Sequence, residues 1–236
     1  MHFWLLERAY WISLTSWYHL LVFGVWVPVM AALSLRRVRA QPAGVPLNRL
    51  KHLQSSAFIL VAFGALSLIA ARSQYINLLR PVLLAPQWSI PAAVLLYVGA
   101  VMAMRPRWRR AVERRERIVH LYMPQTTAER GWWIAVSVLA GISEELTWRG
   151  MQPILLTALT GSVAMGVLGS AALFGLGHSP QGTRSAVVIG IFSLGFNALV
   201  WLSGSLYLAM AVHIAYDLTA GFTYGKLGRE LGYEPK

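Results

Sequence analysis

The chain has 236 residues, of which 56% are hydrophobic and only 13% are charged, and its mean hydropathy is +0.53. Soluble domains carry about 25% charged residues, so this composition excludes an ordinary soluble domain. It predicts an all-α fold, a polytopic bundle of membrane-spanning helices. The sequence contains no cysteine, which excludes disulfides, thiolate metal ligands and a cysteine nucleophile.

The formal net charge of +12 raises the question of nucleic-acid binding. The distribution of the charge argues against it, because the densest basic run, RPRWRRAVERRER at 105–117, directly follows an apolar segment. Such a run is typical of a topology signal that faces anionic lipid. We therefore expect anionic lipids at the basic loops and no nucleic-acid partner.

The first half of the chain contains three apolar segments that approach the length of about 20 residues that a membrane span requires. They lie at 18–35, 55–71 and 89–104. Residues 81–88 either extend the third segment or lie in the interface, because their prolines disfavour one straight helix.

The second half contains four more apolar segments, separated by the short polar breaks TGS, SPQGTR and SGS. We expect the first of them to be one long helix with a kink at Pro153. The prediction is seven spans, or six to eight, with 1–17 or 74–88 as the further candidates. The four segments lie at about 131–158, 163–178, 185–203 and 205–223.

The basic residues predict the orientation of these spans. Arginine and lysine are concentrated in the loops at 36–51 and 105–130 and in the C-terminal tail, which the positive-inside rule places in the cytoplasm. We expect one integral-membrane domain in a cell's inner or plasma membrane. Its parts are N-terminal helices with a basic loop (1–130), a helical core (131–223) and a cytoplasmic tail (224–236).

A small set of charged and ionisable residues interrupts the apolar segments of the core. Such residues cost about 2.5–3.5 kcal/mol each at the centre of a span, so they usually serve a site. Glu145 and Arg149 have the i, i+4 spacing of an ion pair, while Glu144 points about 100° away from Glu145. His213 and Asp217 also share a helix face. The full set is Glu144, Glu145, Arg149, His178, His213 and Asp217.

Peptide hydrolysis requires an activated water and donors for the tetrahedral oxyanion, and carboxylates and histidines can supply both. The chain has a single aspartate, so an aspartyl dyad is excluded, and it has neither an HExxH nor a GxSxG motif. We expect no cofactor. A zinc site formed by Glu144, His178 and His213 is the alternative, because these ligand types suit catalytic zinc.

Three motifs in this region resemble those of one family. EELTWRG resembles EExxxR, LFGLGH resembles FxxxH, and HIAYD resembles a histidine followed four residues later by asparagine or aspartate. Together they resemble the CPBP (Abi) family, which includes the type II CAAX prenyl endopeptidases. The resemblance implies a glutamate-type intramembrane endopeptidase that cleaves a membrane-associated protein or peptide.

The resemblance also implies roles for individual residues. Glu144 would activate the water with His178 as its partner, and His213 and Asp217 would stabilise the oxyanion. Glu145, Arg149 and Phe174 match supporting positions.

Asp217 stands where many members have asparagine. An ionised aspartate cannot donate a hydrogen bond, so Asp217 is either protonated or only orients His213. Two other classes of function stay open: a non-catalytic membrane scaffold or immunity-type protein, and a proton-coupled transporter.

Overall fold

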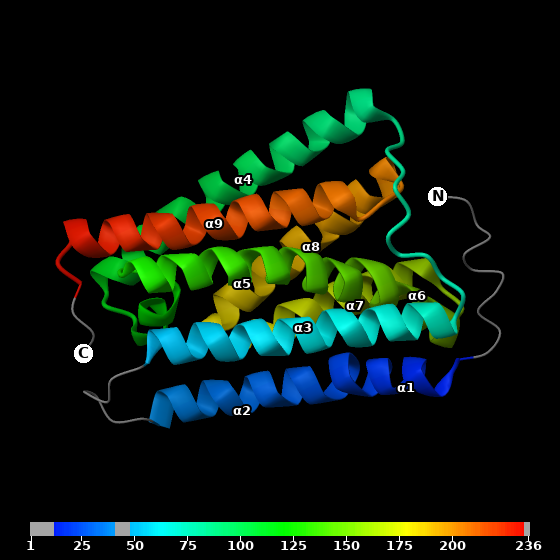
Figure 1. Ribbon diagram of the computed structural model, residues 1–236, viewed down its shortest axis with the longest axis horizontal. Coiled ribbons are helices and arrows are strands. Elements are labelled where there is room, and N and C mark those ends of the chain that lie inside the picture. Colours follow the sequence, from blue (N-terminus) through cyan, green and yellow to red (C-terminus); the bar gives the residue numbers. More distant parts are fainter. Residues whose placement is uncertain (1–11, 41–47, 234–236) are drawn as a thin grey trace.

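The computed structural model describes residues 12–40 and 48–233, and every regular element in these ranges is a helix. The predicted all-α helix bundle is confirmed (Figure 1). The α-helices are α1 (Leu14–Leu21), α2 (Val27–Ala40), α3 (Arg49–Ser73), α4 (Pro86–Glu113), α5 (Thr127–Glu145), α6 (Gln152–Thr160), α7 (Val163–Gly177), α8 (Thr183–Ser203) and α9 (Tyr207–Glu230). The π-helical turns are η2 (Val22–Trp26) and η4 (Leu146–Met151), and the 3-10 turns are η3 (Arg117–Tyr122) and η5 (Ser179–Gln181).

Several helices extend beyond the predicted apolar segments. The prediction of a loop over 105–130 is wrong in its first part, because α4 continues to Glu113. Arginine is a good helix former, and Arg109 pairs with Glu113 at i, i+4 across 2.8 Å. Helix α9 likewise continues to Glu230, and so includes the first part of the predicted tail. At the other end of α4, residues 81–85 do not extend the helix, which begins at Pro86.

The breaks predicted in the second half are confirmed by the way the helices end. Helix α6 ends at Gly161 and α8 at Gly204, both with the positive φ that glycine adopts without a steric penalty. At the start of α5, Thr126 and Glu129 form a capping box. The possible span at 1–17 falls largely outside the described residues.

The π-turn η4 joins α5 to α6 and ends two residues before Pro153, where a kink was predicted. The backbone N–H of Gln152 bonds to the carbonyl of Thr147, the i→i−5 pattern of a π-helix. Pro153 has no N–H, so it cannot bond to the next carbonyl in that pattern, that of Trp148. The Ser170 hydroxyl from α7 donates to this carbonyl instead, at 2.6 Å. A buried side chain thereby satisfies the group that the proline leaves without a donor.

The helices lie roughly side by side along the long axis of the molecule (Figure 1). Helix α5 packs against α3 and α9, α4 packs against α9, and α7 packs against α6 and α8. Helix α3 begins, and α2, α4 and α9 end, at the same end of the bundle. The three basic regions that were predicted to share the cytoplasmic side therefore adjoin one end, here named the basic end.

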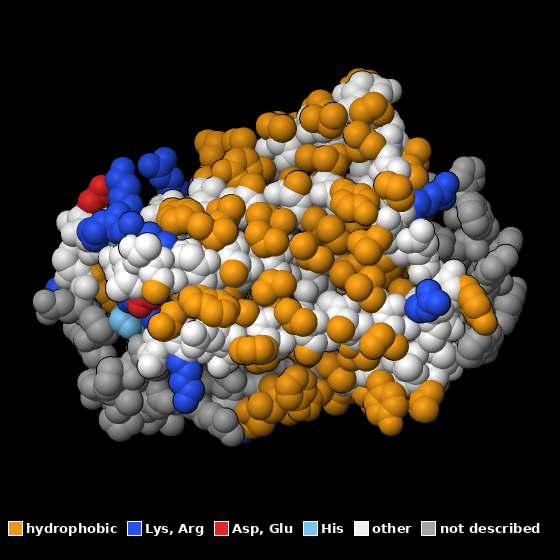
Figure 2. Space-filling view, viewed as in Figure 1, with side chains coloured by type: hydrophobic (Ala, Val, Ile, Leu, Met, Phe, Trp, Pro, Cys, Tyr) orange, Lys and Arg blue, Asp and Glu red, His pale blue; other side chains and the backbone are white. Residues whose placement is uncertain are grey.

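The visible surface has the pattern of a membrane protein. Hydrophobic side chains cover its middle, and Lys and Arg side chains lie toward the two ends (Figure 2). Four described helical segments are long and apolar enough to cross a membrane: Leu14–Ser34, Arg49–Ser73, Pro86–Glu113 and Thr183–Ser203. Helix α7 is apolar but shorter. The count of seven spans stays a prediction.

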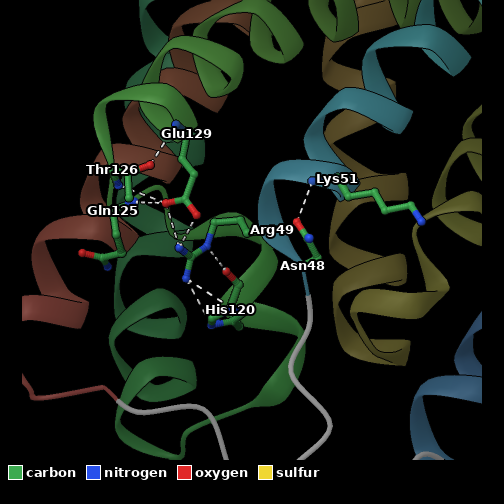
Figure 3. Close-up of polar contacts among 7 residues, drawn as sticks. All are labelled: Asn48, Arg49, Lys51, His120, Gln125, Thr126 and Glu129. Atoms are coloured by element: carbon green, nitrogen blue, oxygen red, sulfur yellow. Dashed lines mark hydrogen bonds and ion pairs between the residues drawn. The ribbon is translucent and has the colours of Figure 1, made fainter.

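A cluster of polar contacts ties three segments together at the basic end (Figure 3). Arg49 Nη1, at the start of α3, lies 2.8 Å from both carboxylate oxygens of Glu129 in α5. The Arg49 Nε–H also donates to the carbonyl of His120 in η3, at 2.7 Å. This cluster fixes η3 against the ends of α3 and α5.

Candidate active site

The two adjacent glutamates end α5 and point in different directions, as their rotation about the helix axis requires. The side chain of Glu145 is fully buried, whereas that of Glu144 is 18% exposed and lines a cavity. One turn later Arg149 lies in the π-turn η4, all six residues of which are buried.

Glu145 is the centre of a buried charge cluster. Its Oε1 lies 2.9 Å from Arg149 Nη1, which is the predicted ion pair, and 2.7 Å from Nδ1 of His213 on α9. Because an ionised carboxylate only accepts, His213 donates from Nδ1. Its Nε2 then faces Glu144 Oε2 and Asp217 Oδ2, each at 3.7 Å. These two distances are too long for hydrogen bonds.

Two aromatic rings hold the guanidinium of Arg149. Its Cζ lies 4.3 Å from the ring centroid of Phe174 and 4.8 Å from that of Phe196. A cation over an aromatic face is stabilised by the ring quadrupole, more so where water is excluded. Phe174 was predicted to support the site, whereas the part played by Phe196 was missed.

His178 follows the last residue of α7 and approaches the cavity from a second helix. Its Nδ1 lies 2.9 Å from the carbonyl of Phe174, which can only accept. Nδ1 therefore carries a proton, and in the neutral ring Nε2 keeps its lone pair. The ring also packs against Phe174, with centroids 4.5 Å apart. The orientation and the tautomer of His178 are thus both fixed locally.

A cavity of about 410 Å³ brings the predicted residues together. It is lined by Glu144 from α5, His178 from the end of α7, and His213 and Asp217 from α9, and its walls include Phe174 and Arg149. Glu145 is not among the lining residues, but it contacts two of them, Arg149 and His213. The structure therefore places the four residues predicted to be catalytic around one space.

The cavity extends toward the basic end, where Ile118, Val119 and Tyr122 of η3 contribute to its lining. Burial, with a smaller effect of the carboxylates of Asp217 and Glu144, raises the pKa of the Tyr122 phenol to about 12. The phenol stays protonated at physiological pH, so this part of the cavity lining contains a neutral hydroxyl.

Sequence reasoning missed other residues of this site. The Trp133 indole donates to the backbone carbonyl of Asp217 at 3.1 Å, which fixes α9 against α5. Arg107 lines the cavity and donates to Ser185 at 2.6 Å. Neither belongs to the three motifs, and their types are common at membrane interfaces. No signal in a single sequence distinguishes them from interfacial residues.

No group of three or more His, Asp and Glu side chains within residues 12–40 and 48–233 is arranged to hold a metal ion. The zinc alternative stays a prediction. It is addressed by experiment below.

The comparison with known families tests the predicted resemblance to the CPBP family. Residues 126–219 match the family model described as type II CAAX prenyl endopeptidase Rce1-like. The predicted family resemblance is confirmed over this segment. The Rce1-like segment runs from the cap of α5 into α9 and contains all seven residues predicted for the site. No curated protein and no solved structure matches the chain.

Proposed function

We propose that this protein is a multi-pass intramembrane endopeptidase that hydrolyses a peptide bond of a membrane-associated protein or peptide. The observation that carries the proposal is the convergence of Glu144, His178 and His213, from three helices, on one cavity inside a bundle with membrane-spanning character. The Rce1-like segment supports protease activity, because the model that it matches is described as a type II CAAX prenyl endopeptidase.

In this proposal Glu144 is the general base. No hydrogen bond occupies its carboxylate among the described residues, and it faces the cavity, so it is available to accept a proton from a water molecule. His178 lines the same cavity with an acceptor at Nε2. It can hold that water, accept from Glu144 the proton that came from the water, and transfer this proton to the leaving amine, which returns Glu144 to the carboxylate form.

His213 is the proposed donor to the oxyanion. Glu145 accepts from Nδ1 and so fixes the plane of the ring. A proton on Nε2 would be directed toward the space between Glu144 and Asp217. In that form the ring is a cation and can stabilise the negative charge of the tetrahedral intermediate.

Orientation of His213 was one of two roles considered for Asp217. The contact of 2.7 Å between Glu145 and His213 provides this orientation without Asp217. We therefore favour a protonated Asp217 as a second donor at the oxyanion. We further propose that the basic end faces the cytoplasm and contacts anionic lipid.

The proposal is tested by comparing newly formed protein termini in membranes that contain the wild type or Glu144→Gln. General base catalysis contributes about 10²–10⁴-fold, so the variant should lose the cleavage products while the protein still inserts. His178→Ala and His213→Ala should lose them as well. Glu113→Gln, on the exposed part of α4, is the matched control and should cleave normally.

Normal cleavage by any two of the three site variants would contradict the catalytic assignment and favour a scaffold. Loss of a proton flux instead of loss of cleavage would favour a transporter. A metal chelator should leave cleavage unchanged. Inhibition that added Zn²⁺ reverses would establish the zinc alternative.

A further inference from the structure

A second buried polar centre contacts the π-turn, and two of its three residues, His19 and Ser67, lie outside the Rce1-like segment. His19 of α1 is completely buried, as are Ser67 of α3 and Thr147 of η4. His19 Nε2 lies 3.1 Å from the Ser67 hydroxyl, which lies 2.8 Å from the Thr147 hydroxyl. This His19 chain connects the N-terminal helix to the segment that carries Arg149.

The direction of the first hydrogen bond follows from the available protons. Ser67 is placed to donate to the carbonyl of Phe63 and Thr147 to that of Ser143, at 3.0 and 2.8 Å. Two hydroxyl protons thus serve three contacts, the two with carbonyls and the one between the hydroxyls. We therefore assign His19 as the donor to Ser67, with its proton on Nε2, because neither hydroxyl then has to donate to the ring as well.

Both ends of the π-turn lie near His19 and its neighbours. Thr147 is its second residue, and Gln152 follows directly after its last. The buried Gln152 amide faces His19. It also lies close to Gly24 of η2, since a Cβ added at Gly24 would be only 3.8 Å from Gln152 Nε2. Between these ends, Trp148 packs edge-on against Phe23, with ring centroids 5.5 Å apart.

The π-turn requires such support because its hydrogen-bond pattern is rare and is usually found at functional sites. It sets the position of Arg149, and through Glu145 it sets the position of His213. Trp148 and Arg149 of the turn line the catalytic cavity, whereas His19, Ser67 and Thr147 are not among its lining residues.

We propose that His19 is a positioning residue, which acts through Ser67 and Thr147 to hold the π-turn in the form that aligns Glu145, Arg149 and His213. The activity part of the proposal rests on the proposed function. The structural part, the coupling of His19 to Thr147, does not.

Side chains whose donor atoms reach different distances from the backbone distinguish hydrogen bonding by residue 19 from simple packing. A glutamine amide reaches about as far as the Nε2 of histidine, whereas an asparagine amide reaches only as far as Nδ1. His19→Gln should therefore restore the bond to Ser67, while His19→Asn and His19→Phe should not. Tyr18→Phe, on the exposed face of the same helix, is the matched control.

The first test measures kcat and KM for the cleavage of one membrane substrate. We expect His19→Phe and His19→Asn to lower kcat by about tenfold or more with little change in KM, since a displacement of about 1 Å far from the chemistry can cost about 10²-fold. His19→Gln and Tyr18→Phe should stay within about twofold to threefold of the wild type. Equal losses in all three His19 variants, or wild-type rates in all three, would overturn the proposal.

The second test is a double-mutant cycle on thermal stability, and it decides the structural part even if no substrate is cleaved. His19→Phe and Thr147→Val should together lower Tm by clearly less than the sum of their separate effects, because either change breaks the same chain. Additive losses would show that the two residues are independent and would overturn the coupling. Absence of proteolysis in the wild type, with coupling retained, would contradict only the proposed function.

Discussion

Two clusters in this protein are built from the same three residue types, and they differ in how completely their polar atoms are bonded. At the basic end, Arg49 binds both oxygens of Glu129, and one of these also accepts from the backbone N–H groups of Gln125 and Thr126 (Figure 3). Arg49 further donates to the carbonyl and the ring of His120. This cluster has the properties of a structural tie between helices.

The inner cluster of Arg149, Glu145 and His213 is more deeply buried and less completely bonded. Arg149 and His213 both donate to the same oxygen, Glu145 Oε1. Glu145 Oε2 and Arg149 Nε are buried without a hydrogen-bond partner among the described residues. Buried groups of this kind need an explanation, because nearly all others in proteins are paired. A site that must rearrange charge during a reaction provides one.

The largest expected effect in this comparison is on the inner cluster. Arg149→Ala would leave Glu145 without its only permanently charged partner, and breaking a buried pair in this way costs about 3–5 kcal/mol. We expect lower expression, a lower thermal stability and lost activity. The measurement is thermal unfolding in detergent. A variant that matches the wild type would show that His213 alone neutralises Glu145.

A smaller effect is expected at the basic end. Glu129→Gln should lower the free energy of unfolding by about 1–3 kcal/mol at neutral pH, because the Gln125, Thr126 and Arg49 donors lose a charged acceptor. Activity per folded molecule should be unchanged, since Glu129 does not line the cavity.

The pH dependence of this effect has a definite sign. Partial burial alone would raise the pKa of Glu129, but the Thr126 and Gln125 N–H groups and Arg49 together hold it below its ordinary value of 4.5. A lowered folded-state pKa stabilises the protein fully above the unfolded value and is lost as pH falls through the folded value. The difference between wild type and Glu129→Gln should therefore shrink below about pH 4.5 in stability measurements. A constant difference down to pH 3 would contradict the assignment.

The smallest effect is expected for Asp217→Asn. Asparagine donates a hydrogen bond at every pH, so this variant should retain activity within about tenfold and extend it to higher pH if deprotonation of Asp217 limits the native protein. A pH–rate profile of both proteins on one substrate provides the measurement. A large loss at all pH values would instead favour an ionised Asp217 as an essential carboxylate.

The sequence allowed the helical class and the breaks at Gly161 and Gly204 to be predicted, because composition and local backbone preferences determine them. The positions predicted for the C-terminal ends of α4 and α9 were wrong by several residues. Hydropathy indicates where a span leaves the apolar layer, whereas a helix ends where its hydrogen bonds and caps end.

The convergence of Glu144, His178 and His213 was anticipated from their motifs, and so was the Glu145–Arg149 pair from its i, i+4 spacing. The bond between Glu145 and His213 was not anticipated, because it depends on the packing of α5 against α9. The roles of Phe196, Trp133 and His19 escaped detection for the same reason. Such long-range contacts leave no periodic signal in one sequence.

We infer that the carboxylate of Glu144, which has no hydrogen bond within the described part of the chain, performs chemistry, whereas the fully bonded carboxylate of Glu129 only stabilises the fold. The most direct measurement compares Glu144→Gln with Glu129→Gln in the same two assays, cleavage of one membrane substrate and thermal unfolding. We expect Glu144→Gln to reduce cleavage by about 10²–10⁴-fold and to keep the wild-type Tm. Glu129→Gln should keep the wild-type rate of cleavage and have a lower Tm. Cleavage at the wild-type rate by Glu144→Gln would contradict the claim.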